Sequence, residues 1–319
     1  MKKVQLYELK SLYRDSLKIY GYQFGGNEKT VCIVGAIRGN EIQQLYMCSQ
    51  LVRVLRLLEE RGQIDSKRGI MIVPSVNPYS LNTNTRFWAT DNTDINRMFP
   101  GYDLGETTQR IADGFFKKVN DYTYGIHFTS FYLEGNFTPH VRIMKTGYEN
   151  AEIAKEFGMP YIMLRNPKPY DTTTLNYEWQ LWGTQAFSLY TPGTDQIDKA
   201  QAGEGINAVL RFLASQGLLR ISQDGGYRSR IIEEQELVTV RTTQSGILFF
   251  YCRCGDHIRE GQVVGEIMDA YEGNVIETIQ SPCSGRIFYH GSNPLIYSNT
   301  AVVKIIRDPQ AEYLTSGNF

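Results

Sequence analysis

The stretch VCIVGAIRGNEIQQLYMCSQLVRVLRLLEE, residues 31–60, decides the fold. It opens with an apolar, β-branched run over residues 31–34, which is typical of a buried parallel strand. A tight turn over residues 35–39 follows, where glycine allows backbone conformations closed to other residues. Apolar residues then recur every three or four positions, which predicts a helix. Ligands of open α/β sheets bind beyond the carboxyl ends of the strands, so Arg38 and Glu41 stand where chemistry is expected.

The segments around this stretch extend the same pattern. Residues 16–24 read as a further strand, and residues 69–74 read as a buried strand after the helix, which completes a β-α-β unit. The plain alternative for the turn is a polar connection, in which Glu41 is favoured by the dipole of the helix that it begins.

Composition excludes several classes of partner. The chain has 319 residues, of which 42% are hydrophobic and 21% charged, as in an ordinary globular protein. A net charge of −1 gives no reason to expect nucleic acid or an anionic membrane as a partner. No apolar run resembles a signal peptide or a membrane span, so a cytoplasmic location is expected. The five cysteines are scattered and are expected to be reduced thiols rather than a zinc array.

A second landmark, NPYSLNTNTRFWATDNTDINRMFPG, occupies residues 77–101. Together with the first stretch it resembles the succinylglutamate desuccinylase/aspartoacylase branch of the zinc carboxypeptidase superfamily. The first motif of that family reads Gly-x-His-Gly-(Asp/Asn)-Glu, and its histidine and glutamate are zinc ligands. Here Glu41 is kept, but the histidine position holds Arg38.

The second motif of the family is nearly complete in this chain. It runs from Asn-Pro through a loop with an arginine to Asp-(Leu/Ile)-Asn-Arg-x-Phe-Pro-Gly. The resemblance implies that Arg86 polarises the scissile carbonyl and that Asn96 and Arg97 grip a substrate carboxylate. Guanidinium groups suit both tasks, because they bind carboxylates bidentately and stabilise a developing oxyanion. The alternative for Arg97 is a structural ion pair with a nearby carboxylate such as Asp94.

A third landmark places His127 at the end of a predicted strand, where the resemblance implies the third zinc ligand. A single histidine can equally be a satisfied core residue. The family's aspartate two residues earlier, which orients the metal site, is Gly125 here. His140 is expected in a loop that closes the pocket and is a further candidate for a replacement ligand.

The fourth landmark is YEWQLWGTQAFSLYTPG, residues 177–193. The family has its general-base glutamate after a similar segment, and the matching position here holds Tyr190. A tyrosine with an ordinary pKa near 10 is a poor base at neutral pH. Glu178 could replace it only if the chain folded Glu178 back toward the site.

These substitutions leave two functions open. A catalytic zinc normally has three protein ligands, and Arg38 has no lone pair to offer beside Glu41 and His127. The first reading is a zinc-dependent hydrolase that cleaves an amide in an N-acyl amino acid, with impaired chemistry. The second is an inactive homologue that has no cofactor and binds a small carboxylate or a protein partner.

The composition changes near residue 224, which predicts domains over 1–224 and 225–319. The resemblance implies a carboxypeptidase-like mixed sheet flanked by helices, an α/β fold, in the first domain. The second reads as short strands and resembles a barrel-sandwich (biotinyl/lipoyl-like) domain. Its turn over residues 268–273 contains no lysine, so neither biotin nor lipoate is expected. A wall over the pocket or a contact between copies in a homo-oligomer is the expected role.

Overall fold

A computed structural model describes residues 1–11, 15–131 and 134–308. The chain divides into two units, which are described separately below. The first comprises residues 1–130 and 139–232, and the second comprises residues 131–138 and 233–319. None of the described helices is long and apolar enough to cross a membrane.

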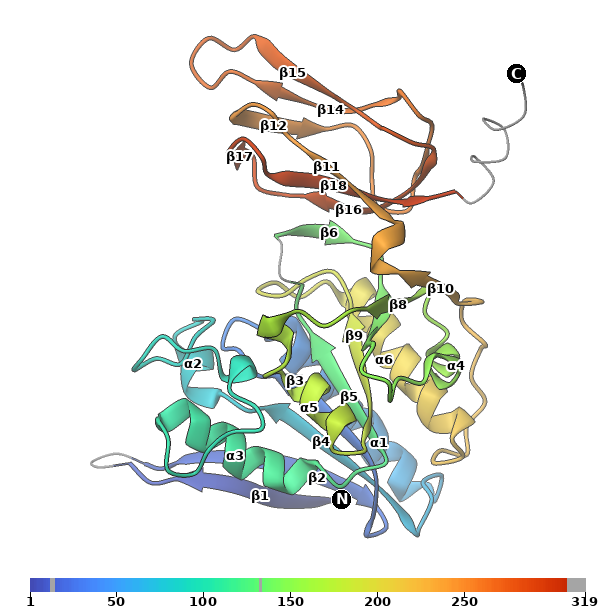
Figure 1. The fold of residues 1–319 in the computed structure, drawn as a ribbon. Coiled ribbons are helices and arrows are strands. Elements are labelled where there is room, and N and C mark those ends of the chain that lie inside the picture. The colour runs from blue at the N-terminus through green and yellow to red at the C-terminus, as the bar shows by residue number, and fades with distance from the viewer. Residues whose placement is uncertain (12–14, 132–133, 309–319) are drawn as a thin grey trace. The chain divides into compact units, whose positions relative to one another are not determined.

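A mixed β-sheet forms the centre of the first unit (Figure 1). Its described strands are β1 (Lys2–Leu9), β2 (Leu17–Gly25), β3 (Glu28–Ala36), β4 (Arg68–Ser75), β5 (Tyr124–Thr129), β7 (His140–Met144), β8 (Tyr161–Arg165), β9 (Gln185–Tyr190) and β10 (Arg230–Glu233). They lie in the order β1-β2-β4-β3-β5-β9-β7-β8-β10. Strands β4, β3, β5 and β9 are parallel neighbours, whereas β1, β2 and β7 pair antiparallel with their neighbours toward this centre.

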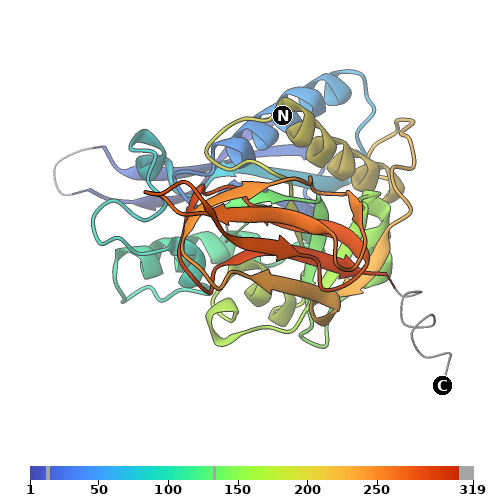
Figure 2. The same ribbon diagram turned by 90° about the horizontal axis from the view of Figure 1, so that it is seen from above.

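Helices cover both faces of this sheet. They are α1 (Ile42–Glu60), α2 (Pro78–Asn82), η1 (Ile95–Arg97), α3 (Thr107–Val119), α4 (Ala151–Ala154), η2 (Lys155–Phe157), η3 (Pro169–Asp171), α5 (Leu175–Leu181) and α6 (Lys199–Ser215). Figure 2 shows α1, in blue, and α6, in olive yellow, together on one side. Helices α3 and α5 cover the opposite face (Figure 1). The expected α/β fold with a large mixed sheet is confirmed.

Strand β3 shows why the opening stretch folds in this way. Its β-branched run is buried on both faces, since Val31 and Ile33 pack into the core under α1 and α6. Cys32 and Val34 alternate with them and pack into the core on the side of α3 and α5. A strand covered on both faces reads as a continuous apolar run, as this one does.

The glycines of the following turn have a different role from the expected one. Neither Gly35 nor Gly39 has a positive φ, so the expectation of special backbone conformations is wrong. A Cβ on Gly39 would instead lie 2.2 Å from the Ser80 carbonyl carbon, and one on Gly35 would lie 2.5 Å from the Pro74 oxygen. The turn needs glycine because neighbouring backbone approaches closely.

Antiparallel sheets make up the second unit. Its described elements are β6 (Gly135–Phe137), η4 (Glu234–Glu236), β11 (Leu237–Arg241), β12 (Gly246–Phe250), β13 (His257–Ile258), β14 (Val263–Met268), β15 (Val275–Gln280), β16 (Gly285–Gly291), β17 (Leu295–Ile296) and β18 (Ala301–Arg307). One sheet has the order β11-β18-β16-β13, with β6 also paired to β16, and the other has the order β15-β14-β12-β17. The two share a core that includes Val264, Ile287 and Ile305.

Candidate functional site

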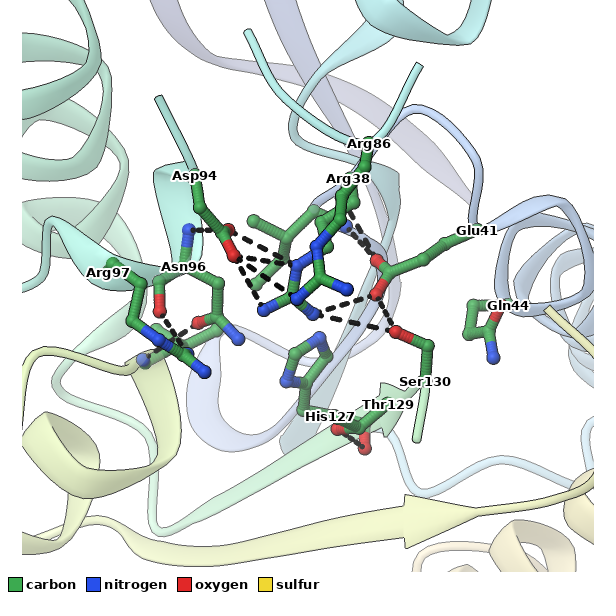
Figure 3. Close-up of polar contacts among 12 residues, drawn as sticks. Arg38, Glu41, Gln44, Arg86, Asp94, Asn96, Arg97, His127, Thr129 and Ser130 are labelled. Carbon is green, nitrogen blue, oxygen red and sulfur yellow. Dashed lines mark hydrogen bonds and ion pairs between the residues drawn. The ribbon is translucent and has the colours of Figure 1, made fainter. Parts of the chain in front are cut away.

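The motifs meet at one edge of the central sheet. The turn with Arg38 follows the C-terminal end of β3, and Ser130 follows the C-terminal end of the neighbouring parallel strand β5. Because carboxyl ends of parallel strands share an edge, the sheet gathers groups that are distant in sequence. Figure 3 shows Arg86, Asp94 and Asn96, all from the second motif, gathered around the Arg38 guanidinium.

Glu41 is a fully buried carboxylate whose two oxygens accept four hydrogen bonds. Its Oε2 accepts hydrogen bonds from the backbone N–H groups of Ile37, at 2.9 Å, and Arg38, at 3.0 Å. Its Oε1 accepts from Arg38 Nη1, at 3.0 Å, and from the Ser130 hydroxyl, at 2.6 Å. These four hydrogen bonds hold the Glu41 carboxylate in one position and engage both of its oxygens.

Arg38 bridges two carboxylates. Besides Glu41 it binds Asp94, with Nη2 to Oδ2 at 2.9 Å and Nε to Oδ1 at 3.2 Å. Burial alone would lower the pKa of Arg38, but the charges of Glu41 and Asp94 outweigh it and raise that pKa. Arg38 therefore keeps its positive charge although only 4% of the residue is exposed.

The sequence left open an ion pair between Arg97 and Asp94, but Asp94 has other partners. It pairs with Arg38 and, at 3.7 Å from Oδ2 to Nη2, with Arg86. Arg97 Nη1 instead donates to the backbone carbonyl of Asn96, at 2.9 Å. The Asn96 side chain is anchored through Oδ1, which accepts the backbone N–H of Leu175 at 3.1 Å.

Arg86 is the more accessible of the two arginines that pair with Asp94. Its side chain is 38% exposed, and its pKa is lowered, chiefly by partial burial and then by the charge of Arg38. Two neighbouring cations are stabilised when an anion binds beside them, because the anion offsets their mutual repulsion. Arg86 and Arg97 are thus suited to hold an incoming carboxylate.

His127 lies buried on β5 and is neutral. Its pKa is lowered to about 4, chiefly because burial disfavours the charged ring, although the Glu41 carboxylate partly offsets this. The Asn176 amide Nδ2 lies 3.2 Å from Nδ1 and also donates to the Ser188 hydroxyl. Nε2 makes no hydrogen bond within the described chain, although the Gly35 carbonyl lies near the ring.

Trp179 explains why residue 125 cannot carry the family's aspartate. A Cβ on Gly125 would lie 2.5 Å from Trp179 Cε3, and the indole is held by its N–H bond to the Val119 carbonyl, at 2.9 Å. The space of a carboxylate is therefore filled by an indole ring. The amide of Asn176, one helix turn earlier in α5, contacts His127 in its stead.

Tyr190 is the last residue of β9 and is held from two sides. Its ring stacks on His140, with centroids 4.8 Å apart, and lies under the Arg142 guanidinium, 4.3 Å from its centroid. Arg142 Nη1 also donates to the Tyr190 hydroxyl, at 3.1 Å.

The expectation that His140 lies in a loop is wrong, since His140 begins β7 and is fully buried. Glu178 lies in α5 and accepts a hydrogen bond from Trp182 Nε1, at 3.2 Å.

The residues present do not fit the zinc ion that the resemblance implies. Among the described residues, no three His, Cys, Asp or Glu side chains are grouped so that they could hold a metal ion. At the position of the family's histidine, Arg38 offers N–H donors and a positive charge. A cation there repels a metal ion and occupies the Glu41 oxygen that would bind it.

Three contacts of the site escaped the sequence analysis. Ser130 and Asn176 lie outside the motifs, and the Asp94 carboxylate binds Arg38 rather than the arginine near it in sequence. The position of Ser130 just after a strand that carries a motif histidine was a weak signal for it. Asn176 gave none, since the fold of α5 against β5 decides its position.

Comparison with known proteins identifies the family. The model of the succinylglutamate desuccinylase/aspartoacylase catalytic domain matches residues 27–215, more than half of the chain. An N-alpha-acetyl-L-2,4-diaminobutyric acid deacetylase from Halomonas elongata is 23% identical over 261 residues, covering 78% of this chain and 73% of that protein.

Two solved structures share the fold over nearly the whole chain. A succinylglutamate desuccinylase from Silicibacter sp. TM1040 superposes with a TM-score of 0.78 at 17% identity, covering 96% of this chain and 93% of that one. A succinylglutamate desuccinylase/aspartoacylase from Rhodobacter sphaeroides gives a TM-score of 0.77 at 19% identity, covering 96% of both chains. The chain is a member of the succinylglutamate desuccinylase/aspartoacylase family.

Proposed function

We propose that this protein binds a small carboxylate of the N-acyl amino acid type and does not hydrolyse it. The observation that carries the proposal is the Arg38 guanidinium between Glu41 and Asp94, with the cations Arg86 and Arg97 beside this network. The groups that recognise a carboxylate are present, whereas the arrangement that would activate water is replaced by an ion-pair network.

Carboxylate recognition is assigned to Arg86, Asn96 and Arg97. Arg97 has five N–H donors, of which one is committed to the neighbouring backbone carbonyl. Asn96 uses Oδ1 for its anchor and keeps its amide N–H groups for a ligand. Donors of this kind, held by a rigid turn, bind a planar carboxylate with defined geometry.

Hydrolysis is the competing function, and the family favours it. The matched model is that of a catalytic domain, and the relative from Halomonas elongata is named as a deacetylase. In that case Arg86 would stabilise the oxyanion and the base would have to come from the position of Tyr190. The contacts of Arg38 argue against hydrolysis, since Glu41 is fully committed to hydrogen bonds.

The second unit is proposed to be a domain of the barrel-sandwich type without a carrier function. Two small antiparallel sheets over a shared core support this type. The turn between β14 and β15, residues 269–274, holds no lysine for biotin or lipoate.

Thermal denaturation with a panel of N-acetyl amino acids tests the proposal. The wild-type protein should be stabilised by at least one of them, and Arg97→Ala should lose that stabilisation while keeping its own cooperative unfolding. Arg53→Ala, on the exposed face of α1, is the matched control and should respond like the wild type. The absence of any response by the wild type, or an unchanged response by Arg97→Ala, would contradict the proposal. Release of acetate by the wild type would favour the hydrolase.

A further inference from the structure

Within the described chain, Arg38 is the one side chain that lies at hydrogen-bond distance from both the Glu41 and the Asp94 carboxylates. It reaches Glu41 Oε1 at 3.0 Å and Asp94 Oδ2 at 2.9 Å. The Glu41 side chain is 0% exposed and the Asp94 side chain 10% exposed. Two carboxylates buried to this extent need a cation beside them, because little water reaches them to screen their charges.

Asp94 transmits this contact to the anion-binding turn. Its Oδ1 accepts the backbone N–H of Asn96, at 3.0 Å, and so caps the short helix η1 that carries Asn96 and Arg97. The same carboxylate is held by Arg38. The orientation of the second motif therefore depends on Arg38, although Arg38 lies in the first.

Glu41 anchors the other end of the bridge. Two backbone N–H groups of its own turn and the Ser130 hydroxyl fix the carboxylate, which in turn fixes Arg38 Nη1. The ring of His127 lies beside the guanidinium (Figure 3). Glu41, Ser130 and the turn after β3 thus hold the Arg38 guanidinium in place.

We propose that Arg38 is a built-in cation that assembles this site in place of a bound metal ion, so that the protein folds with its anion-binding groups in position and takes up no zinc. In this role Arg38 is a positioning residue. The inference concerns how the site is held together and goes beyond the proposed function, because it stands whichever ligand the site takes.

Replacement of Arg38 by a metal-binding side chain gives the direct test. Arg38→His places an imidazole beside Glu41 and His127, and it should bind about one zinc per chain, the three ligands leaving a fourth position to water. Its zinc affinity should exceed that of the wild type by at least about 100-fold. Cobalt should give the visible absorption of a protein-bound ion in Arg38→His alone. The matched control is Arg38→Met, which loses the same ion pairs but supplies no lone pair of comparable strength.

Stability provides the second measurement. Zinc should raise the melting temperature of Arg38→His and leave the wild type and Arg38→Met unchanged. Arg38→Lys should recover at least about half of the melting temperature that Arg38→Met loses, since its ammonium still pairs with one carboxylate. If Arg38 only filled space, Arg38→Lys would be no more stable than Arg38→Met, because the charge would not matter.

Each outcome bears on the inference. About one zinc per chain in the wild type, or a folded Arg38→His that binds zinc no better than Arg38→Met, would overturn it. If Arg38→His folds only when zinc is added, the inference is supported. If it folds under neither condition, Arg38→Lys decides, and equal destabilisation of Arg38→Lys and Arg38→Met would refute the role of the charge. Failure of every carboxylate to bind the wild type would remove the proposed function without affecting these results.

Discussion

Arg38 and Asp94 are 56 residues apart in the sequence and form a buried ion pair through two nitrogens of the guanidinium. The pair joins the turn after β3 to the turn that carries Asn96 and Arg97. A buried pair of this kind stabilises little in total, but removal of one partner costs more, because the remaining buried charge loses part of its compensation. This asymmetry makes the network sensitive to single substitutions.

Asp94→Asn should therefore be destabilising. Arg38 would keep Glu41 as its charged partner but lose its charged hydrogen bonds to Asp94, and we expect the free energy of unfolding to fall by about 1–3 kcal/mol. Chemical denaturation measures this change. The control Asp113→Asn removes the partner of Lys117, whose side chain is 60% exposed, and should cost no more than about 0.5 kcal/mol. A loss below about 1 kcal/mol for Asp94→Asn would show that the pair is not critical.

The charge of the site should select ligands with one carboxylate. Arg38 and Arg86 pair with the two carboxylates, and Arg97, which donates to the Asn96 backbone carbonyl, lies beside them. With His127 neutral, three positive and two negative charges leave one positive charge in excess. N-acetylasparagine and N-acetylaspartate have nearly the same shape and differ by one charge. We expect N-acetylasparagine to bind about tenfold more tightly, a difference of about 1.4 kcal/mol by calorimetry. Equal or tighter binding of N-acetylaspartate would contradict the charge count.

His127 should make stability depend on pH. Its pKa is about 4 in the folded protein and about 6.5 when unfolded. As the pH falls below about 6.5, the unfolded chain takes up the proton first, so the contribution of His127 is complete above that pH and is lost progressively toward pH 4. His127→Gln should flatten the dependence in this window, measured by urea denaturation at several pH values. An unchanged pH slope in His127→Gln would contradict this dependence.

Gly125→Asp should fail to restore the carboxylate of the family. The new side chain would collide with Trp179 and bury a charge, so we expect a loss of about 3 kcal/mol or more in the free energy of unfolding. Trp179→Ala opens the space, and the double variant should be less destabilised than the sum of the single ones. Gly203→Asp, where a Cβ meets nothing within 4 Å, is the control and should be nearly neutral. Additive losses would show that Trp179 does not exclude the aspartate.

The sequence by itself indicated the family and the α/β class, and it predicted that Arg38 stands at the position of a metal ligand. These conclusions rest on local patterns: an apolar strand, a turn of fixed length, a helix with regular spacing, and a second motif with its letters in order. Such patterns are readable because neighbours in sequence remain neighbours in a strand, a turn or a helix.

Only the tertiary structure decided which groups meet. It paired Asp94 with Arg38, brought Ser130 to Glu41 and Asn176 to His127, and placed His140 on a strand. The order of strands in the sheet and the packing of helices on it bring together residues that are far apart in the chain, and no local pattern encodes those distances. The close approach of backbone to Gly39 has the same origin, since it depends on where α2 packs.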